Sequence, residues 1–285
     1  MELIQVADDG GDEMTLVSYN GRKYPKFPGC VDTQTLERLP SVEIRPDDIL
    51  VCAFPKSGTN WVWEMARLLV AGKLDHDEIG KGTAMLEAHL EETFKDLPSP
   101  RVLNTHLLFD ELPEQVKVKK PRILYLTRNP KDVTVSYYNF VKKMPKYYNY
   151  TGEWNNFVRP SLEGKFDYGS WFDYVKDWEE VKKTTDVPIL TLSYEDMKED
   201  AYTELKKARE FLGIERSDDF VKEVCDHCSF ASMKTIKTKS SEIVYRKGGT
   251  GDWKNWFTVA QNEWFDQTYK KTTQDCPLKF RYTLK

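Results

Sequence analysis

Cysteine is scarce in this 285-residue sequence, and long hydrophobic runs are absent. The five cysteines are odd in number and scattered, which argues against a disulfide framework and favours a reducing compartment. No apolar stretch approaches the roughly 20 residues that are needed to span a bilayer. Residues 1–12 are acidic and lack the basic start and the apolar run of a secretory signal. We therefore expect a cytoplasmic protein that does not bind a membrane.

The sequence also lacks an excess of positive charge, a repeat and a Gly/Ser-rich linker. Its 42 lysines and arginines face 46 aspartates and glutamates, so the net charge is −4. We therefore expect no general affinity for nucleic acid or for anionic membranes. Hydrophobic residues make up 40% of the chain and charged residues 31%, which is typical of a folded protein. We expect one domain over residues 1–285.

Short apolar runs alternate with segments of helical length along the chain. The runs, which we expect to be strands, cover residues 48–54, 101–105, 122–127 and 188–193. The helices are expected over residues 61–70, 130–143, 170–184, 201–212, 218–226 and 259–272. This alternation predicts an α/β fold with a central parallel sheet and helices on both of its faces. Residues 1–45 are rich in turn residues, and we expect an irregular segment that packs over one side of a pocket.

Polar side chains follow the ends of these four runs. The first run leads into the loop Pro55-Lys-Ser-Gly-Thr-Asn-Trp61 and then into a helix, an order that can bind an anion through backbone N–H groups. His106, Arg128 and Tyr194 follow the other three runs, and Ser136 lies in the helix after Arg128. Because the carboxyl ends of parallel strands meet at one edge of a sheet, we expect a ligand there.

The residue types at this edge favour a polyanion that is bound without magnesium. The loop is not the P-loop of nucleotide triphosphatases, because Lys56 precedes its only glycine. The third run is followed by Arg128 instead of an acid, and only Glu195 and Asp196, after the fourth run, could hold a metal ion. This pattern favours a sulfuryl donor over ATP.

Three blocks of sequence resemble the cytosolic sulfotransferase family, of the aryl and alcohol type. They are FPKSGTNW at residues 54–61, RNPKDVTVSYYNF at residues 128–140 and RKGGTGDW at residues 246–253. The resemblance implies one α/β domain with a P-loop-like strand–loop–helix motif. It also implies transfer of a sulfuryl group from 3′-phosphoadenosine 5′-phosphosulfate (PAPS) to a hydroxyl or amine of a phenol, steroid or alcohol. The product of the donor would be PAP, and no metal would be needed.

The resemblance further implies roles for individual residues. His106 would be the catalytic base, Lys56 would stabilise the leaving oxygen, and Ser136 would restrain Lys56 until the acceptor binds. The residues that would bind the donor are Lys56, Ser57, Gly58, Thr59, Asn60, Trp61, Arg128, Ser136, Tyr194, Cys228, Ser229, Phe230, Met233, Arg246, Lys247 and Gly248. Those expected to contact the acceptor are Phe27, Asn104, His106, Phe140 and Tyr245. A homodimer is implied through Lys254, Thr258, Val259 and Glu263.

Two positions depart from the family pattern. Asn104 stands where the family usually has lysine, two residues before the histidine. An amide can still donate to a sulfuryl oxygen, but a charge-assisted hydrogen bond is roughly twice as strong. We therefore expect slower turnover or an altered acceptor preference. Cys228 stands where the family often has threonine, and this exchange should matter little.

Other interpretations of these patterns remain open. A kinase could use the same α/β scaffold, although the order of glycine and lysine in the loop argues against it. A binding protein that holds 3′-phosphoadenosine ligands or hydrophobic molecules without catalysis is favoured by Asn104 alone. Cys225, His227 and Cys228 suggest zinc, but a second Cys/His pair is missing. The segment around Thr258 could also be ordinary helix-start chemistry.

Overall fold

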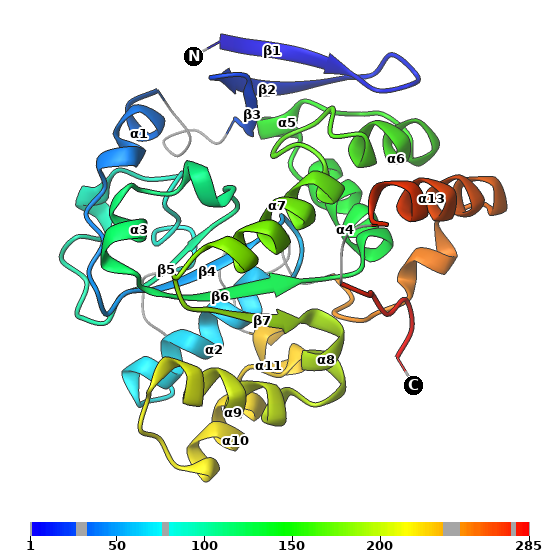
Figure 1. The fold of residues 1–285 in the computed structure, drawn as a ribbon. Coiled ribbons are helices and arrows are strands. Elements are labelled where there is room, and N and C mark those ends of the chain that lie inside the picture. Colours follow the sequence, from blue (N-terminus) through cyan, green and yellow to red (C-terminus); the bar gives the residue numbers. More distant parts are fainter. Residues whose placement is uncertain (1, 27–32, 76–79, 236–245, 275–277, 285) are drawn as a thin grey trace.

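Parallel strands form a sheet at the centre of the molecule (Figure 1). The computed structural model describes residues 2–26, 33–75, 80–235, 246–274 and 278–284. The sheet has the order β5-β4-β6-β7, with β4 (Ile49–Ala53), β5 (Val102–Thr105), β6 (Arg122–Thr127) and β7 (Ile189–Ser193). All neighbouring strands of this sheet are parallel. The predicted strands are confirmed, and β6 has the predicted bounds.

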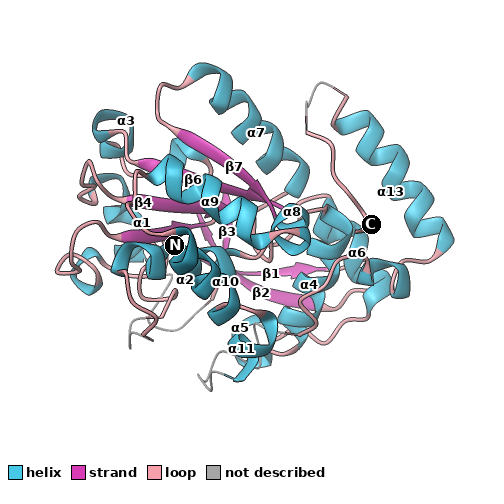
Figure 2. Ribbon diagram, turned by 90° about the horizontal axis from the view of Figure 1, so that it is seen from below, coloured by secondary structure: helices cyan, strands magenta, loops and turns pink. Residues whose placement is uncertain are grey.

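Helices cover both faces of this sheet, as the alternating pattern predicts (Figures 1 and 2). One face carries α2 (Thr59–Ala71), α9 (Ala201–Leu212) and α10 (Asp218–His227). The other carries α7 (Trp171–Thr184), with α4 (Pro130–Lys142) towards the carboxyl edge. Tyr125 of β6 stacks on Trp178 of α7 with 5.0 Å between the ring centroids. Because the sheet is covered on both sides, every residue of β4 is buried, which explains its unbroken apolar sequence.

Further elements surround these layers in the described part of the chain. The remaining helices are α1 (Thr33–Arg38), α3 (Gln115–Lys119), α5 (Pro145–Tyr148), α6 (Trp154–Leu162), α8 (Tyr194–Glu199), α11 (Phe230–Thr235) and α13 (Val259–Thr272). Short 3₁₀ turns cover Leu39–Ser41, Glu91–Thr93, Phe109–Glu111 and Asp252–Asn255. None of the described helices combines the length and the hydropathy that crossing a bilayer would require.

Local sequence signals set the helix boundaries around the site. Gly58 and Gly72 adopt left-handed conformations at the two ends of α2. The side chain of Asn129 accepts a hydrogen bond from the Asp132 N–H, and Pro130 occupies the first turn of α4. Ser170 caps α7 in the same way. These signals are readable in the sequence, and they explain why the predicted boundaries of the main helices are close to the observed ones.

The N-terminal region corrects one expectation. Residues 2–25 form an antiparallel sheet of β1 (Glu2–Ala7), β2 (Glu13–Tyr19) and β3 (Arg22–Pro25), so the expected irregular segment over residues 1–45 is wrong here. Asn20 and Gly21, with φ of +48° and +76°, make the tight turn between β2 and β3. Asn-Gly is a strong hairpin signal, and it was available in the sequence. Pro25, at the end of β3, lines the pocket described below.

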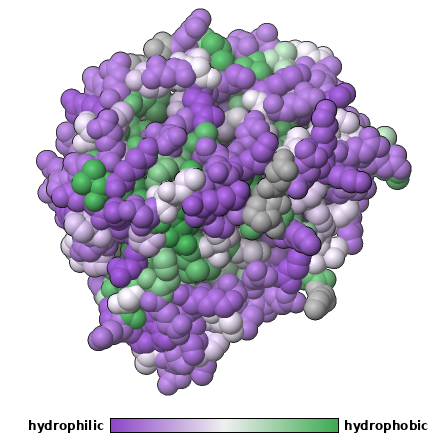
Figure 3. All heavy atoms as spheres, viewed as in Figure 1, coloured by the Kyte–Doolittle hydropathy of each residue, from purple (hydrophilic) through white to green (hydrophobic). Residues whose placement is uncertain are grey.

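The visible face of the molecule is largely hydrophilic, with hydrophobic residues in small groups between polar ones (Figure 3). Among the described residues, few large hydrophobic side chains are exposed, and Val259 is the most exposed of them at 76%. Val118 follows at 73%. Isolated exposed hydrophobic side chains are common on soluble domains, so neither residue by itself marks an interface.

A buried ion pair joins the N-terminal ends of β4 and β5. The Arg101 guanidinium donates to both carboxylate oxygens of Asp48 at 2.8 and 2.6 Å, and neither side chain has exposed surface. Asp48 immediately precedes β4, and Arg101 immediately precedes β5. The pair therefore fixes the two strands next to each other at the edge opposite to the site.

Replacing Arg101 by leucine should lower the free energy of unfolding by about 3–5 kcal/mol, because it leaves the Asp48 carboxylate buried without its partner. Urea denaturation monitored by circular dichroism measures the change. Lys117→Leu is the matched control, since its ion pair with Asp110 is more than half exposed and should contribute less than about 1 kcal/mol. Equal effects of the two substitutions would contradict the prediction.

Candidate active site

A cavity of about 510 Å³ opens at the carboxyl edge of the parallel sheet. Lys56, His106, Arg128 and Tyr194 all line it. His106, Arg128 and Tyr194 directly follow β5, β6 and β7, and Lys56 lies in the loop between β4 and α2. The structure therefore brings together side chains that lie far apart in the sequence, because each follows a strand of one parallel sheet.

The loop between β4 and α2 has the features of an anion site. Lys56 and Gly58 have φ of +68° and +105°, the left-handed region in which successive N–H groups can form a concave nest. The first N–H groups of α2 have no acceptor within the helix. The hydroxyls of Ser57 and Thr59 are buried and have no hydrogen-bond partner among the described residues. A bound anion would satisfy such donors.

Gly58 is required at its position for a second reason. A Cβ atom at Gly58 would lie 2.6 Å from the ring of Tyr194, which is closer than side chains can approach. The ring therefore packs directly on the backbone of the loop. The Arg128 guanidinium lies 4.1 Å from the centre of the same ring.

Arg128 connects three parts of the site. Its Nη1 donates to the Lys56 carbonyl and its Nη2 to the Gly249 carbonyl, each at 3.0 Å. Its Nε atom is buried and has no hydrogen-bond partner among the described residues. The guanidinium thus holds the loop after β4 against the segment around residue 249, and it retains a donor for a ligand.

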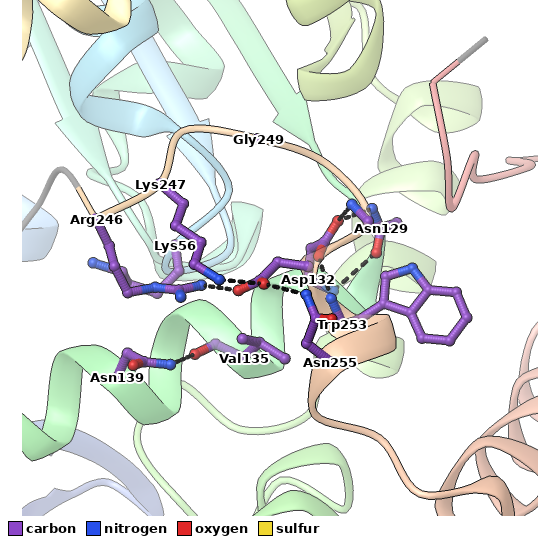
Figure 4. A network of polar contacts seen from close by, with 12 residues as sticks. Lys56, Asn129, Asp132, Val135, Asn139, Arg246, Lys247, Gly249, Trp253 and Asn255 are labelled. Atoms are coloured by element: carbon purple, nitrogen blue, oxygen red, sulfur yellow. Dashed lines mark hydrogen bonds and ion pairs between the residues drawn. The ribbon is translucent and has the colours of Figure 1, made fainter.

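The segment of residues 246–253 is fastened to α4 by a buried aspartate (Figure 4). The Asp132 carboxylate accepts hydrogen bonds from the N–H groups of Gly251 and Trp253 at 2.7 and 3.0 Å. Arg246 and Lys247 both pair with Asp252, at 2.6 and 2.7 Å. Two of the three sequence blocks therefore meet in space, so the cations of the third block lie at the same cavity as Arg128.

Aromatic side chains occupy the end of the cavity near α11. The Trp61 indole N–H donates to the Cys228 carbonyl at 2.8 Å, and its ring meets the Tyr194 ring edge-on at 5.9 Å. Gly248, with φ of +62°, packs on the Phe230 ring, where a Cβ atom would lie 2.1 Å from a ring carbon. Trp61 and Phe230 both line the cavity, as flat surfaces between which a planar ring system could be held.

His106 is held in a defined orientation. Its Nδ1 lies 2.6 Å from the Ala53 carbonyl, which can only accept, so Nδ1 carries the proton and Nε2 is left as an acceptor. The His106 N–H donates to a carboxylate oxygen of the buried Glu87 at 2.8 Å. Burial first, and then the neighbouring Lys81 ammonium, lower the pKa of His106 well below its usual value. The Lys81 ammonium lies 3.3 Å from Nε2 and can donate to it. A neutral imidazole whose Nε2 carries no proton is the form that can take one up.

Lys56 lies among several other cations. Its Nζ is 3.8 Å from the centre of the Phe140 ring. Burial lowers the pKa of Lys56 to about 7, and the positive charges of Lys81, Arg128, Lys143 and Arg246 add to this effect. Figure 4 shows Lys56 and Arg246 side by side above α4. Such a concentration of positive charge in an enclosed site favours a ligand with more than one negative charge.

Most of the residues expected to bind the donor line this one cavity. They are Lys56, Gly58, Thr59, Asn60, Trp61, Arg128, Ser136, Tyr194, Cys228, Phe230, Met233, Arg246, Lys247 and Gly248. Phe140, expected on the acceptor side, lines it too. Two of the expected residues do not line the cavity. Ser57, within the loop, is buried, and the Ser229 hydroxyl bonds to the Ser232 hydroxyl at 2.8 Å. Phe27 and Tyr245 lie outside the described residues.

Asn104 corrects a further expectation. It is fully buried and does not line the cavity. Its Nδ2 donates to the carbonyls of Lys81 and Ala84 at 2.8 and 2.9 Å. Because both amide hydrogens are used in this way, the side chain has no donor left for a sulfuryl oxygen or an acceptor.

Sequence reasoning did not select several residues that shape the cavity. Lys81 stands in a Gly-Lys-Gly stretch that is typical of a surface turn, and Asp132 is an acid in the first helical turn, a common feature of exposed helices. Asp167 lines the cavity as well, and burial raises its pKa to about 7. No local pattern marks these three residues, because their roles depend on contacts between distant segments.

The zinc hypothesis finds no cluster in the part of the chain that the structure describes. Within those residues, no three side chains of His, Cys, Asp or Glu gather as metal ligands. Burial raises the pKa of the Cys225 thiol to about 12.

Comparisons with known proteins agree with this geometry. The profile of the sulfotransferase domain family matches residues 46–277. Sulfotransferase 1A1 of the mouse, Mus musculus, is 40% identical over 274 residues, which cover 87% of this chain and 92% of the mouse protein. Sulfotransferase 1A1 of the rat, Rattus norvegicus, is 40% identical over 273 residues, or 88% of this chain and 93% of that protein.

A solved structure of the mouse sulfotransferase SULT7A1, complexed with PAP, has the same fold. It aligns with a TM-score of 0.78 at 32% identity, and the alignment covers 92% of this chain and 96% of that one. The family profile covers well over half of the chain and includes every element of the parallel sheet. The chain belongs to the sulfotransferase family.

Proposed function

We propose that this enzyme transfers a sulfuryl group from PAPS to a hydroxyl or amine of a small molecule such as a phenol, a steroid or an alcohol. The observation that carries the proposal is the convergence of Lys56, Arg128 and Arg246 with the N-terminus of α2 on one cavity. PAPS carries negative charge at both ends of its ribose, and this arrangement offers donors for both. The SULT7A1 structure, which contains PAP, supports the choice of nucleotide.

PAPS would be held by parts of the site whose hydrogen-bond donors have no partner among the described residues. The loop after β4 offers the Thr59 hydroxyl and the first N–H groups of α2 for the phosphosulfate. Arg128 offers its buried Nε for the 3′-phosphate, together with Ser136 and Arg246. Trp61 and Phe230 would enclose the adenine. When bound, PAPS supplies an activated sulfuryl group, and the residues described next act on the acceptor and on the leaving oxygen.

His106 would act as the base. Its Nε2 carries no proton and the residue lines the cavity, so Nε2 can take the proton of an acceptor hydroxyl that replaces its contact with Lys81. Lys56 would stabilise the negative charge that develops on the leaving oxygen, and Ser136 would restrain Lys56 until the acceptor binds. Both residues line the same cavity as His106.

The acceptor side of the cavity is apolar and aromatic. Its lining includes Pro25, Met85, Phe140, Met144, Tyr147, Tyr148 and Tyr168. The Tyr168 ring meets the His106 ring edge-on at 5.4 Å, so these walls adjoin the base directly. Such walls suit a flat hydrophobic acceptor whose hydroxyl points to His106.

The proposal is tested by incubating the purified chain with PAPS labelled in its sulfate and a panel of phenols, steroids and alcohols. We expect labelled sulfate esters from the wild type. His106→Ala should lower kcat by about 10²–10⁴-fold, because a positioned base contributes that much to proton transfer. His89→Ala, a histidine outside the cavity lining, is the matched control and should keep its activity.

Three results would contradict this proposal. Full activity of His106→Ala would exclude the histidine as the base. Absence of labelled esters together with magnesium-dependent phosphate transfer from ATP would favour the kinase alternative. PAP binding without transfer to any acceptor would instead favour the binding protein.

The affinity for PAP should fall as the pH rises from about 7.5 to about 9, by up to tenfold per pH unit. The pKa of Lys56 is about 7 in the free enzyme, and a bound polyanion raises it, so binding above pH 7 requires uptake of a proton. Phosphate monoesters are already doubly ionised in this range, since their second pKa is about 6. Isothermal titration calorimetry in buffers of different ionisation enthalpy measures both the affinity and the proton uptake.

Lys56→Met is the control for this pH dependence. It should bind PAP more weakly and lose most of the proton uptake. A wild-type affinity that does not change over this pH range would show that the lysine is already charged before PAP binds.

We also propose a homodimer through Lys254, Thr258, Val259 and Glu263, and the cytoplasmic location suggested by the scarce cysteines. All four side chains are exposed around the start of α13, where Thr258 and Gln261 form a capping box. Because the capping box accounts for a threonine at position 258 without a partner subunit, Val259 is the better residue with which to test the dimer.

Val259→Glu should convert the dimer to a monomer, because it would bury a charge in the interface. Multi-angle light scattering at micromolar concentration measures the mass. Val118→Glu is the matched control, since Val118 on α3 is equally exposed and lies outside the proposed contact. A wild type that is monomeric, or a Val259→Glu variant that remains dimeric, would refute this interface.

A further inference from the structure

Lys81 reaches the catalytic histidine from a segment that no sequence motif marks. Its Nζ lies 3.3 Å from Nε2 of His106, the ring nitrogen that carries no proton, and the ammonium can donate to it. Both residues line the cavity. An acceptor hydroxyl that donates to Nε2 in place of the ammonium would bring its oxygen within reach of the Lys81 Nζ.

Asn104 holds the Lys81 segment in place. Its Nδ2 donates to the carbonyls of Lys81 and Ala84, and its backbone N–H donates to the Ala84 carbonyl at 2.8 Å. Leu86 returns a hydrogen bond to the Asn104 carbonyl at 3.0 Å. The strand that leads into His106 therefore also carries the residue that positions Lys81.

Glu87 fastens the other end of this segment. Its carboxylate has no exposed surface and accepts hydrogen bonds from the Thr105 hydroxyl and the His106 N–H, each at 2.8 Å. Tyr168 adds a longer contact at 3.4 Å. The segment from Lys81 to Glu87 is thus anchored to β5 and to the backbone of His106, so Lys81 does not have the position of a lysine on a free surface turn.

We propose that Lys81 is a further catalytic residue, which contacts the acceptor oxygen and stabilises the negative charge that grows on it. The inference rests on the sulfuryl transfer proposed above. In that step the acceptor O–H bond breaks and its proton passes to Nε2 of His106. The acceptor oxygen forms a bond to sulfur, and the bond between sulfur and the 5′-phosphate oxygen breaks to release PAP. Lys81 neither gains nor loses a proton.

The electrostatics around Lys81 are consistent with this role. Burial lowers the pKa of Lys81 to about 8, and the Glu87 carboxylate opposes part of that effect. Near neutral pH the side chain is therefore mostly an ammonium. A charge-assisted hydrogen bond to an oxygen that becomes negative is strongest in the transition state, because the charge is largest there.

The test compares Lys81→Met with the wild type, using PAPS and a series of phenols of increasing acidity. We expect kcat/KM for weakly acidic phenols to fall by about 10- to 100-fold. The loss should shrink for acidic nitrophenols, whose oxygen needs less stabilisation. PAP affinity should change by less than about threefold. Lys81→Arg, which keeps the charge, should recover part of the activity.

A matched control and a double-mutant cycle separate catalysis from structure. Lys119→Met removes an exposed lysine of α3 outside the cavity lining and should retain full activity. Asn104→Ala should weaken catalysis through the placement of Lys81. Its effect should therefore largely disappear in the Lys81→Met background, whereas independent effects would add.

The inference and the proposed function fail in different ways. If the wild type forms sulfate esters and Lys81→Met keeps its kcat/KM, Lys81 has no catalytic role although the sulfotransferase activity stands. A catalytic role is equally excluded if Lys81→Met loses equal activity with all phenols and also loses PAP affinity, because that pattern indicates a structural role. If the wild type forms no ester with any acceptor, the proposed function itself is refuted, and the inference with it.

Discussion

The Arg128 guanidinium donates to two carbonyls that lie far apart in the sequence, those of Lys56 and Gly249. Its plane lies over the Tyr194 ring, which in turn packs on Gly58. The end of β6 is therefore joined to the loop after β4, to the start of α8 and to the 246–253 segment. This contact joins the loop after β4 directly to the 246–253 segment.

The site concentrates positive charge around Lys56, where Lys81, Arg128, Lys143 and Arg246 all act on its ammonium. Lys56 shows the consequence, since burial and the neighbouring cations lower its pKa to about 7. Below pH 7 this lysine is charged in both the folded and the unfolded chain, and its full electrostatic cost then acts against folding. Above pH 7 the folded chain releases the proton that the unfolded chain keeps, so this cost decreases. A bound polyanion removes the same cost, and this links stability to ligand binding.

Two buried carboxylates organise the site by accepting hydrogen bonds from distant parts of the backbone. Asp132 accepts backbone N–H groups of the 246–253 segment, and Glu87 accepts the N–H of His106. Each holds a distant piece of chain in the position where a cation or a base is needed. Each carboxylate is hydrogen-bonded to several donors, which is how a buried carboxylate is tolerated in a protein interior.

The sequence by itself determined the parallel sheet, its main helices and the residues at the strand ends. It could do so because apolar runs, helix caps and the three blocks are local patterns that fold the same way wherever they lie. It also contained the Asn20-Gly21 hairpin signal, which the many turn residues of segment 1–45 obscured. The order of the strands and the shared cavity of Lys56, His106 and Arg128 depend on the parallel topology of the sheet. The alternation of strands and helices in the sequence already indicated this topology.

Only the tertiary structure decided the roles of Asn104, Lys81 and Asp132. Asn104 donates both of its amide hydrogens to carbonyls of another segment, and its place in β5 does not predict this. Lys81 stands in a stretch that resembles a surface turn, yet its ammonium lies beside His106. These roles arise from contacts between segments distant in sequence, and such contacts exist only after the chain has packed.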